Sequence, residues 1–293
     1  MKIITVTLNP CIDVNYKTDI SFEAGKLNRV PSPEVSYNGK GINVSRELKY
    51  LSEESVCLTF CDGGGELFAS LRKEELNVMG PILDSSLRRN TAIIDKNGVQ
   101  TQINEPGMFV SEEKLREFTG MYKAELNTPD ECCVIISGSI PPGISPEYVR
   151  KLVSIAKGAG AFCIVDCDGE ALRRAVEATP DIISPNEDEF FALSGKRLSG
   201  SGEDKRIDAV RAALEYYRNE ECGVLLTLGE DGSVYAGREG SFMCQSVKCD
   251  VKNFKGAGDC FLAAFVYEHI VGGRGCDISM TLAASAASRH MSK

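Results

Sequence analysis

The feature that most constrains the fold of this chain is a repeated alternation of short apolar runs with longer segments of helical character. The apolar runs, which we interpret as buried strands, lie at residues 3–8, 132–137, 162–166, 182–184 and 223–228. The helix-like segments lie near residues 41–52, 66–76, 111–125, 146–158, 169–177, 186–194, 205–219, 259–271 and 277–290. Continuous apolar strands that alternate with helices indicate a mostly parallel sheet covered by helices on both faces. Ligands of such sheets bind beyond the carboxyl ends of the strands, so we expect functional residues in the loops that follow them.

Two segments break this alternation and have the pattern of half-exposed antiparallel strands. In residues 14–20, apolar side chains and threonine share one face while polar side chains take the other. In residues 91–104, Asn97-Gly98 is a strong signal for a hairpin turn. We infer a small second β-sheet that acts as a lid over a ligand site, the alternative being an extra hairpin that does not move. The predicted division is a core of residues 1–11, 38–87 and 106–293 and a lid of residues 12–37 and 88–105.

The composition limits the partners of the chain. With 293 residues, of which 43% are apolar, the chain fits one large α/β domain with an insertion. The net charge of −9 and the pI of about 5.0 argue against binding to nucleic acid or to an anionic membrane. A phosphorylated small ligand remains compatible with this charge, because it needs only a local basic pocket.

The start of the chain and its cysteines predict a cytoplasmic protein. Met1 leads directly into a strand-like run without the pattern of a signal peptide, and no apolar stretch approaches the roughly 20 residues of a membrane span. The chain has 12 cysteines but no C-x-x-C pair, and only two histidines, which argues against a zinc site. We therefore expect reduced, mostly buried thiols.

Several common catalytic motifs are absent from the sequence. It has no Gly-x4-Gly-Lys-Ser/Thr loop, no Gly-x-Gly-x-x-Gly fingerprint, no His-Arg-Asp loop and no Gly-x-Ser-x-Gly elbow, which disfavours P-loop enzymes, common dinucleotide enzymes, protein kinases and common esterases. What remains is a set of glycine-bounded polar clusters at residues 9–13, 37–48, 137–143, 184–190, 227–233 and 256–259. Each alone is compatible with ordinary turn chemistry. All of them at one predicted edge of one sheet favour a common site.

The last of these clusters, Gly256-Ala257-Gly258-Asp259, opens an apolar helix-like run. The first amides of a helix are unpaired and the helix dipole is positive there, so a helix start binds anions well. The glycines let the backbone turn and approach a ligand closely. On this stretch alone, Asp259 either caps the helix or accepts a proton while the amides hold a phosphate.

Taken together, the clusters resemble the PfkB (ribokinase-like) sugar kinases. The shared motifs are TLNPCID, GKGINVSR, ISGSIPPG, VDCDGEAL, PNEDE, LGEDG and GAGD, in family order. GKGINV together with SGSIPPG is specific to the phosphosugar branch, in which the sequence looks most like fructose-1-phosphate kinase and tagatose-6-phosphate kinase. The resemblance implies an α/β fold of the ribokinase-like type, a three-layer α/β/α sandwich with a mostly parallel central sheet and a small β-sheet lid.

The resemblance also implies an ATP-dependent phosphosugar kinase, which transfers the γ-phosphoryl group to a hydroxyl of a ketohexose phosphate and gives a bisphosphate. Fructose 1-phosphate is the first expected acceptor, tagatose 6-phosphate the second and fructose 6-phosphate the third. A kinase of an unphosphorylated sugar or nucleoside and a catalytically inactive sugar-phosphate-binding protein remain as alternatives. Lid sheets of this family often pair between subunits, so we expect a homodimer through the lid.

The resemblance assigns catalysis to the cluster that ends in Asp259. Asp259 would be the base that takes the proton from the acceptor hydroxyl. The amides of Ala257, Gly258 and Asp259, on the turn that Gly256 allows, would stabilise charge on the transferring phosphoryl group. A carboxylate near its ordinary pKa is ionised at pH 7, so we expect that no large pKa shift is required of Asp259.

The same resemblance assigns contacts to the acceptor. The residues expected to bind the sugar are Asp13, Gly39, Lys40, Asn43 and Ser139. An arginine at the start of a lid strand is expected to bind the phosphate that the acceptor already carries, which suits its planar fork. Arg88 and Arg89 both stand there, and the register with the following NTAII favours Arg89. Arg29 is a weaker candidate.

The nucleotide side is assigned in the same way. Asn186 and Glu189 match the N-x-x-E element of the family, which organises Mg²⁺ through water, in keeping with the several waters that Mg²⁺ usually retains. Thr227, Gly229 and Gly232 are expected to line the phosphates and ribose of ATP. ATP and Mg²⁺ are therefore the expected cofactors.

The sequence also departs from the family pattern. Asn38 stands where the family has glycine, and Ser184 stands where it often has lysine. Phe254 and Lys255 replace small or β-branched residues, and we expect them to alter the fit of the nucleotide. Cys260, beside the expected base, is either an oxidisable thiol at a helix start or a buried, inert thiol, and we prefer the second interpretation. Only residues 260–293 follow that base, so we expect the nucleotide side to lack the last helix of the family.

Overall fold

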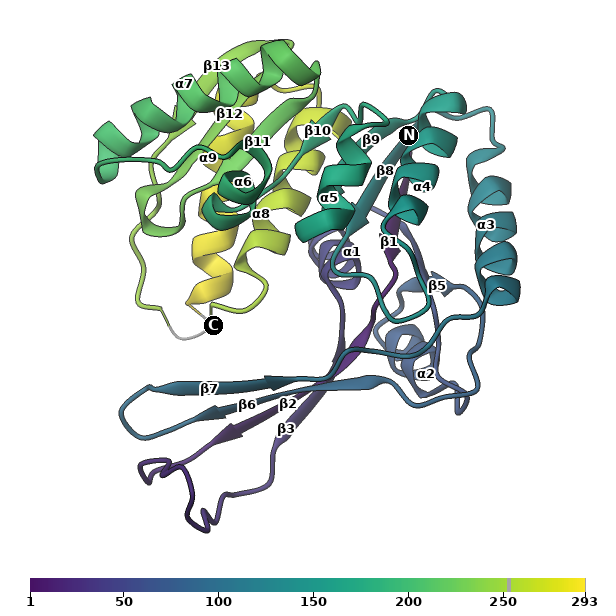
Figure 1. The fold of residues 1–293 in the computed structure, drawn as a ribbon, viewed down its shortest axis with the longest axis vertical. Helices are drawn as coiled ribbons and strands as arrows, with labels where there is room; N and C mark the ends of the chain where they lie inside the picture. Colours follow the sequence, from purple (N-terminus) through teal and green to yellow (C-terminus); the bar gives the residue numbers. More distant parts are fainter. Residues whose placement is uncertain (252–253, 293) are drawn as a thin grey trace.

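The computed structural model describes residues 1–251 and 254–292 as a layered core with a second sheet that stands away from it (Figure 1). Within these residues the central sheet has nine strands in the order β13-β12-β11-β10-β9-β8-β1-β4-β5. Their bounds are Lys2–Thr7 (β1), Val56–Thr59 (β4), Asn77–Met79 (β5), Cys132–Ser137 (β8), Phe162–Asp166 (β9), Ile182–Ile183 (β10), Gly223–Thr227 (β11), Ser233–Gly237 (β12) and Gly240–Cys244 (β13). From β5 across to β11 all neighbours are parallel, whereas β12 and β13 add an antiparallel hairpin at one edge.

Helices cover both faces of this sheet. Their bounds are Lys40–Tyr50 (α1), Glu66–Lys73 (α2), Glu112–Leu126 (α3), Glu147–Gly158 (α4), Gly169–Val176 (α5), Glu187–Ser194 (α6), Gly202–Glu220 (α7), Ala257–Phe265 (α8) and Cys276–Met291 (α9). The core on one face takes side chains from α2 to α7 and Ile42 of α1, and the core on the other face takes them from the rest of α1, from α8 and from α9. The three-layer α/β fold with a mostly parallel sheet is therefore confirmed.

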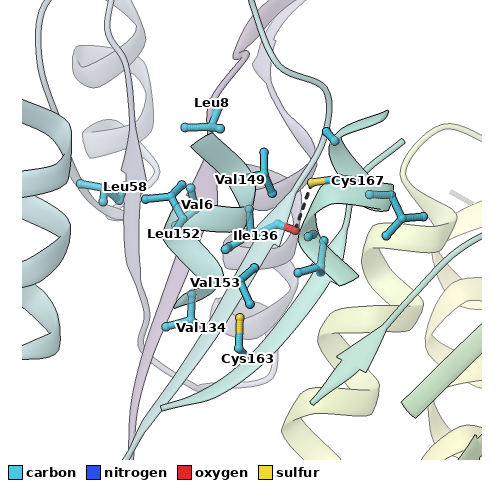
Figure 2. Close-up of a cluster of buried hydrophobic side chains, with 14 of the residues drawn as sticks. Val6, Leu8, Leu58, Val134, Ile136, Val149, Leu152, Val153, Cys163 and Cys167 are labelled. Atoms are coloured by element: carbon cyan, nitrogen blue, oxygen red, sulfur yellow. Dashed lines mark hydrogen bonds between the residues drawn. The ribbon is translucent and has the colours of Figure 1, made fainter. Parts of the chain in front are cut away.

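The two cores explain why the strands are continuously apolar. Successive residues of a strand point to opposite faces, so Ile4 and Val6 of β1 enter one core while Ile3 enters the other. Figure 2 shows the first of these cores, in which Leu152 and Val153 of α4 lie against the strands. Because both faces are buried, every position of β1 from Ile3 onward must be compatible with burial.

The second sheet, which we call the lid sheet, has the strand order β3-β2-β6-β7. Its strands are Cys11–Lys17 (β2), Glu34–Asn38 (β3), Arg88–Ile94 (β6) and Gln100–Asn104 (β7). The hairpin between β6 and β7 closes at Asn97-Gly98, where Asp95 accepts backbone hydrogen bonds from Asn97 at 2.8 Å and Val99 at 3.0 Å. The pairs β2–β3 and β6–β7 are antiparallel, but β2 and β6 pair parallel, which the sequence analysis did not predict. Both strands leave the core and run in the same direction, so they pair parallel.

Four central strands were also missing from the prediction, namely β4, β5, β12 and β13. The last two form the antiparallel edge, in which short strands are separated by a tight turn and not by a helix. The helix predicted at 259–271 begins earlier, at Ala257, and its second half, Val266–Val271, is π-helical.

The cysteines behave as the sequence predicted. None forms a disulfide, and all but Cys249 are buried. Among the helices of the described residues, none combines the length and the apolar character needed to cross a bilayer.

Candidate active site

A cavity of about 330 Å³, which we call the first cavity, lies between the carboxyl edge of the central sheet and the lid sheet. The start of α1, the end of β9, the start of α6, the loop before α8 and strands β2 and β6 all contribute to its walls. The sequence-predicted residues that line it are Asp13, Gly39, Lys40, Asn43, Asn186, Glu189, Thr227, Gly256, Gly258 and Asp259. Clusters that are far apart in the sequence therefore meet at one end of the molecule.

The start of α1 lies directly on β1, and two glycines make this possible. A Cβ on Gly39 would stand 2.5 Å from Cγ2 of Thr7, and a Cβ on Gly41 would stand 2.6 Å from Oγ1 of Thr7 and 2.8 Å from the carbonyl oxygen of Val6. A side chain at either position would push the helix away from the strand. The close approach holds Lys40 and the rest of the first helical turn over the cavity.

Asp259 is a buried carboxylate in the first turn of α8. Gly256 is the N-cap residue, at a φ of 84°, and no side chain caps the helix, so Asp259 is not a helix cap. Its Oδ2 accepts a hydrogen bond from Nδ2 of Asn43 at 2.7 Å. Burial raises the pKa of Asp259 above its ordinary value, while the bond from Asn43 and the charge of Lys40 act in the opposite direction. The sequence analysis had expected that no large pKa shift is required of this carboxylate.

Asp166, at the end of β9, is a site residue to which the sequence analysis gave no role. Its Oδ1 forms an ion pair with Nζ of Lys40 at 2.9 Å. Burial raises the pKa of Asp166 to about 6, although Lys40 opposes the shift. Burial acts to lower the pKa of Lys40, but the charges of Asp166 and Glu189 outweigh it and hold that pKa above its ordinary value. The sequence feature that could have indicated Asp166 is its position as an acidic residue at the end of a predicted buried strand.

Asn186 and Glu189 form a capping box at the start of α6. The side chain of Asn186 accepts from the amide of Glu189 at 2.9 Å, and Oε2 of Glu189 accepts from the amide of Asn186 at 2.8 Å. Burial raises the pKa of Glu189, which Lys40 opposes. The N-x-x-E element therefore fixes the helix start and at the same time lines the cavity.

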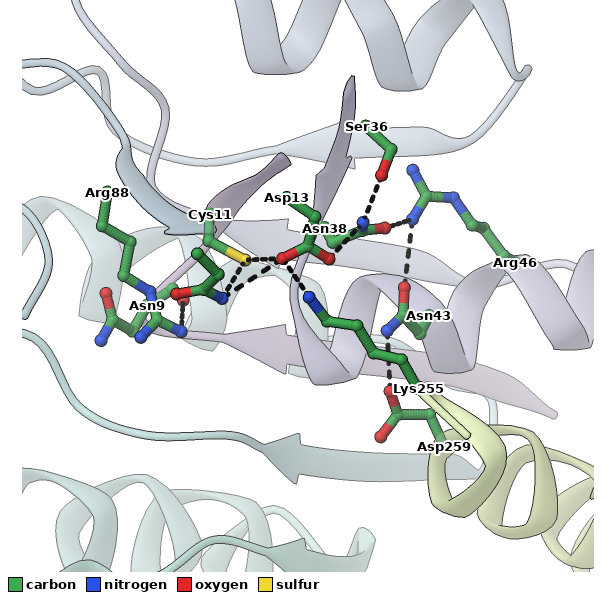
Figure 3. Close-up of polar contacts among 11 residues, drawn as sticks. Asn9, Cys11, Asp13, Ser36, Asn38, Asn43, Arg46, Arg88, Lys255 and Asp259 are labelled. Carbon is green, nitrogen blue, oxygen red and sulfur yellow. Dashed lines mark hydrogen bonds and ion pairs between the residues drawn. The ribbon is translucent and has the colours of Figure 1, made fainter. Parts of the chain in front are cut away.

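The lid side of the first cavity is built around Asp13 (Figure 3). Its Oδ2 accepts from Nδ2 of Asn38 at 2.6 Å, and its Oδ1 pairs with Nζ of Lys255 at 2.5 Å. Arg46 bonds the side-chain oxygens of both Asn38 and Asn43. A continuous polar chain thus joins the lid sheet to Asn43 and, through it, to α8. Asn38, which the sequence analysis described as a departure from the motif, takes part in this chain.

The two arginines at the start of β6 point to different places. Arg88 lines the first cavity, where its Nη2 donates to the carbonyl oxygen of Asn9 at 3.0 Å. Arg89, which the sequence analysis preferred, is exposed. Its backbone amide donates to the side chain of Glu105 at 2.8 Å, and its carbonyl oxygen accepts from the amide of Glu105 at 3.1 Å. Neighbouring residues of a strand face opposite sides, so only one of the two arginines can line this cavity. Arg29 is exposed and does not line it either.

Ser139 also lies outside the walls of the first cavity. Its hydroxyl accepts a hydrogen bond from Nδ2 of Asn9 at 3.1 Å, and the same amide donates to the carbonyl oxygen of Pro106 at 3.1 Å. Ser139 therefore helps to join the core to the segment that returns from the lid sheet.

A second cavity, of about 760 Å³, lies beside the first on the other side of the α8 start. Both cavities are lined by Thr227 and Gly258, so they meet at the start of that helix. Its sequence-predicted lining residues are Thr227, Gly229, Gly232, Ala257 and Gly258. Apolar side chains complete the wall, contributed by Val247, Val251, Phe254, Phe261, Ala284, Ala287 and Met291.

The second cavity fits a nucleoside triphosphate. Its apolar wall suits a base, and glycine backbone together with the helix start suits phosphates. Among the described residues, no group of three or more histidine, cysteine or acidic side chains is placed to hold a metal directly. A cation held by the phosphates and by water, near Glu189, fits this arrangement.

Comparison with known families identifies the chain. Its residues 5–291 match the pfkB family carbohydrate kinase. The chain belongs to the pfkB family of carbohydrate kinases. The enzyme is therefore a phosphotransferase that acts on an alcohol group, and its family implies ATP as the phosphoryl donor.

Solved structures agree with this assignment. Phosphofructokinase-2 from Escherichia coli in complex with substrates and products is 26% identical, with a TM-score of 0.89 over 100% of this chain and 94% of that one. A possible 1-phosphofructokinase from Thermotoga maritima is 30% identical, with a TM-score of 0.84 over 100% of this chain and 92% of that one. A putative phosphofructokinase from Staphylococcus aureus is 27% identical, with a TM-score of 0.79 over 99% and 92%. The kinase therefore shares its whole architecture with phosphosugar kinases.

Proposed function

We propose that the kinase transfers the γ-phosphoryl group of Mg-ATP to a hydroxyl group of a ketohexose phosphate and so makes a bisphosphate. Fructose 1-phosphate is the first candidate acceptor, tagatose 6-phosphate the second and fructose 6-phosphate the third. One observation carries the proposal: the first cavity has the buried carboxylate of Asp259 at its helix end and the guanidinium of Arg88 at its lid end. An acceptor that spans this cavity presents a hydroxyl to the first and a phosphate to the second.

The carboxylate of Asp259 takes the proton of the attacking hydroxyl. As the hydroxyl oxygen bonds to the γ-phosphorus, the bond from that phosphorus to the β-phosphate oxygen breaks, and ADP leaves with the electron pair. Asn43 holds Oδ2 of Asp259 by its 2.7 Å hydrogen bond and favours the ionised form of the base. General base catalysis of this kind typically contributes 10²- to 10⁴-fold.

The start of α8 and Lys40 stabilise the charge of the transferring group. The amides of Ala257, Gly258 and Asp259 lie at the first turn of the helix, where the two cavities meet. Lys40 stays protonated beside Asp166, which keeps a positive charge in the wall of the first cavity. Bound Mg-ATP would supply the phosphoryl group and the cation that screens it, with Glu189 and Asn186 as the groups that hold the cation through water.

A phosphorylated acceptor is supported over a neutral one by the arginine at the lid end. Nε of Arg88 is buried and has no hydrogen-bond partner among the described residues. A buried donor without a partner costs free energy, and a phosphate oxygen would satisfy it. The names of the similar structures, a phosphofructokinase-2 and a possible 1-phosphofructokinase, support the same acceptor class.

We also propose that two copies of the chain pair through the outer face of the lid sheet. The register places Val35, Val14, Thr91 and Ile103 in one row across all four strands. Val35 is 57% exposed and Ile103 is 62% exposed, so the ends of this row are open to a partner. The row faces away from Asp13, which is the strand neighbour of Val14. Light scattering after gel filtration of the wild type and of a Val35→Lys, Ile103→Lys variant tests the pairing, with a monomeric variant expected.

The proposed activity is tested by measuring ADP release from Mg-ATP with five acceptors: fructose 1-phosphate, tagatose 6-phosphate, fructose 6-phosphate, fructose and ribose. Turnover on one ketohexose phosphate, lost in Asp259→Asn, is the expected result and names the acceptor. Turnover on fructose or ribose alone would replace the proposal with a kinase of unphosphorylated sugars. Binding of a phosphosugar without any turnover would replace it with a sugar-phosphate-binding protein.

A further inference from the structure

The charges that line the first cavity are divided between its two ends. Asp166, Glu189 and Asp259 stand around Lys40 at the core end, where each acts on the pKa of that lysine. At the lid end stand Arg88 from β6 and Lys255 from the loop before α8. The lid end therefore carries two cations from two different parts of the fold.

These two cations face the same small group of lid side chains. In Figure 3 the side chain of Cys11 lies between those of Arg88 and Lys255. Burial and Asp13 raise the pKa of Cys11 to about 12, and the charges of Arg88 and Lys255 oppose this shift. The thiol itself donates to Oδ1 of Asp13 at 3.6 Å, the oxygen that also pairs with Lys255. A phosphate at this end would thus meet a guanidinium on one side and an ammonium group on the other.

Lys255 and Asp13 differ in their freedom to move. The side chain of Asp13 is 2% exposed, whereas that of Lys255 is 41% exposed and reaches Asp13 from outside the lid sheet. Asp13 has further donors in Asn38, at 2.6 Å, and Asn90, at 3.3 Å, so it keeps partners if the lysine moves. Lys255 is consequently the member of the pair that can change its partner.

We propose that Lys255 is a specificity-determining residue of the acceptor site, which exchanges Asp13 for the phosphate already present on the acceptor. This inference rests on the proposed phosphosugar kinase function. The exchange places the ammonium group opposite Arg88 on the phosphate. It also leaves a place on Oδ1 of Asp13, which keeps its bonds from Cys11 and Asn90, for a hydrogen bond from an acceptor hydroxyl. A neutral sugar must break the same ion pair without giving Lys255 a new anion, so the pair also discriminates against unphosphorylated sugars.

The exchange differs from two other roles that a lysine here can have. As a fixed latch on Asp13, Lys255 would oppose every acceptor, and its removal would strengthen acceptor binding. As a partner of the transferring phosphoryl group, it would act on kcat and on the KM for ATP. Only in the proposed role does the removal of Lys255 weaken the binding of phosphorylated acceptors alone.

The test compares Lys255→Met, Lys255→Arg and wild type, with Lys96→Met as a matched control because Lys96 is exposed on the lid hairpin and lines neither cavity. We expect Lys255→Met to raise the KM for the phosphosugar about 10- to 100-fold, the loss expected for a hydrogen bond between charged groups. The KM for ATP should stay within about twofold. Lys255→Arg should recover most of the loss, and the control should match the wild type.

The preference for a phosphosugar over fructose, as a ratio of kcat/KM values, should fall in Lys255→Met by at least the factor by which the phosphosugar KM rises, because fructose no longer has an ion pair to break. An unchanged or lower phosphosugar KM in this variant would overturn the proposal, as would a loss confined to kcat and the KM for ATP. Calorimetric binding of fructose 1-phosphate, tagatose 6-phosphate and fructose 6-phosphate without nucleotide measures the same contact. It therefore separates failure of this inference from a wild type that binds a phosphosugar but does not turn it over.

Discussion

The side-chain amide of Asn43 donates a 2.7 Å hydrogen bond to Oδ2 of Asp259 and so joins the first turn of α1 to the first turn of α8. The orientation of this amide is fixed in turn, because its oxygen accepts from Nη1 of Arg46 at 3.1 Å. A carboxylate held by one oxygen presents the other to the cavity. The geometry thus gives Asp259 both a fixed direction and a partner that favours its ionised form.

Replacement of Asp259 by asparagine should abolish turnover without unfolding the protein. We expect kcat to fall by about 10³-fold or more, towards the upper range of general base catalysis. Because burial raises the pKa of Asp259, ionising this carboxyl costs more in the folded protein than in the unfolded chain, and stability is lost as the pH rises through that pKa. The variant should therefore melt at the same temperature as the wild type at pH 7, or higher. A kcat within tenfold of wild type would remove Asp259 from the role of base.

Replacement of Asn43 by alanine should change the pH dependence of the reaction. The bond from Asn43 lowers the pKa of Asp259, so its loss should raise that pKa further and move the acid limb of the kcat/KM profile to higher pH. The loss of activity should consequently be larger at pH 6 than at pH 8. Steady-state kinetics from pH 5 to 9 measure this shift. An equal loss at every pH would mean that Asn43 acts only by contact with the acceptor.

The sequence was sufficient for most of the fold because burial leaves a strong pattern. β1, β8, β9 and β11 are buried at nearly every position, and the layer of helices on each face is the physical cause. The antiparallel edge strands β12 and β13 left no comparable pattern, since they follow one another without a helix. The parallel pairing of β2 with β6 joins two separate insertions, and nothing local in either strand specifies it.

The site was predictable to the level of clusters, but not to the level of contacts. Parallel strands share one carboxyl edge, so clusters such as those at Lys40 and Asp259 were bound to meet there. The choice between Arg88 and Arg89 depended on the register of β6. A shift of one residue moves a side chain to the other face of the strand, and the sequence alone did not determine that register. The ion pair between Lys255 and Asp13 joins segments that are far apart in the sequence. Lys255 belongs to none of the motifs that carry the resemblance, so no motif could indicate this pair.

Replacement of Gly41 by alanine should destabilise the fold and damage the site together. The new Cβ would stand 2.6 Å from Oγ1 of Thr7 and 2.8 Å from the carbonyl oxygen of Val6, and the backbone of β1 cannot move away cheaply. We expect a loss of about 1–3 kcal/mol in the free energy of unfolding, as for overpacked cores. Gly120→Ala is the matched control, because Gly120 lies within α3 with open space around it and should gain up to about 1 kcal/mol. Equal effects of the two substitutions in chemical denaturation would contradict the close approach of α1 to β1.

Replacement of Phe254 by threonine should weaken the binding of ATP. The ring of Phe254 is 73% exposed and lines the apolar wall of the second cavity. A nucleotide that covers this ring removes apolar surface from water, at about 25 cal/mol per Å², so losing the ring should raise the KM for ATP about 5- to 10-fold. The KM for the phosphosugar should not change, because Phe254 does not line the first cavity.

Phe109→Thr is the matched control for this substitution, since Phe109 is 69% exposed and lines neither cavity. Its KM for ATP should equal that of the wild type, which separates the effect of the site from the general effect of removing an exposed ring. A lower KM for ATP in Phe254→Thr would show that the ring obstructs the nucleotide instead of packing on it. Phe254 would then hinder the binding of ATP and would not serve as a binding surface for it.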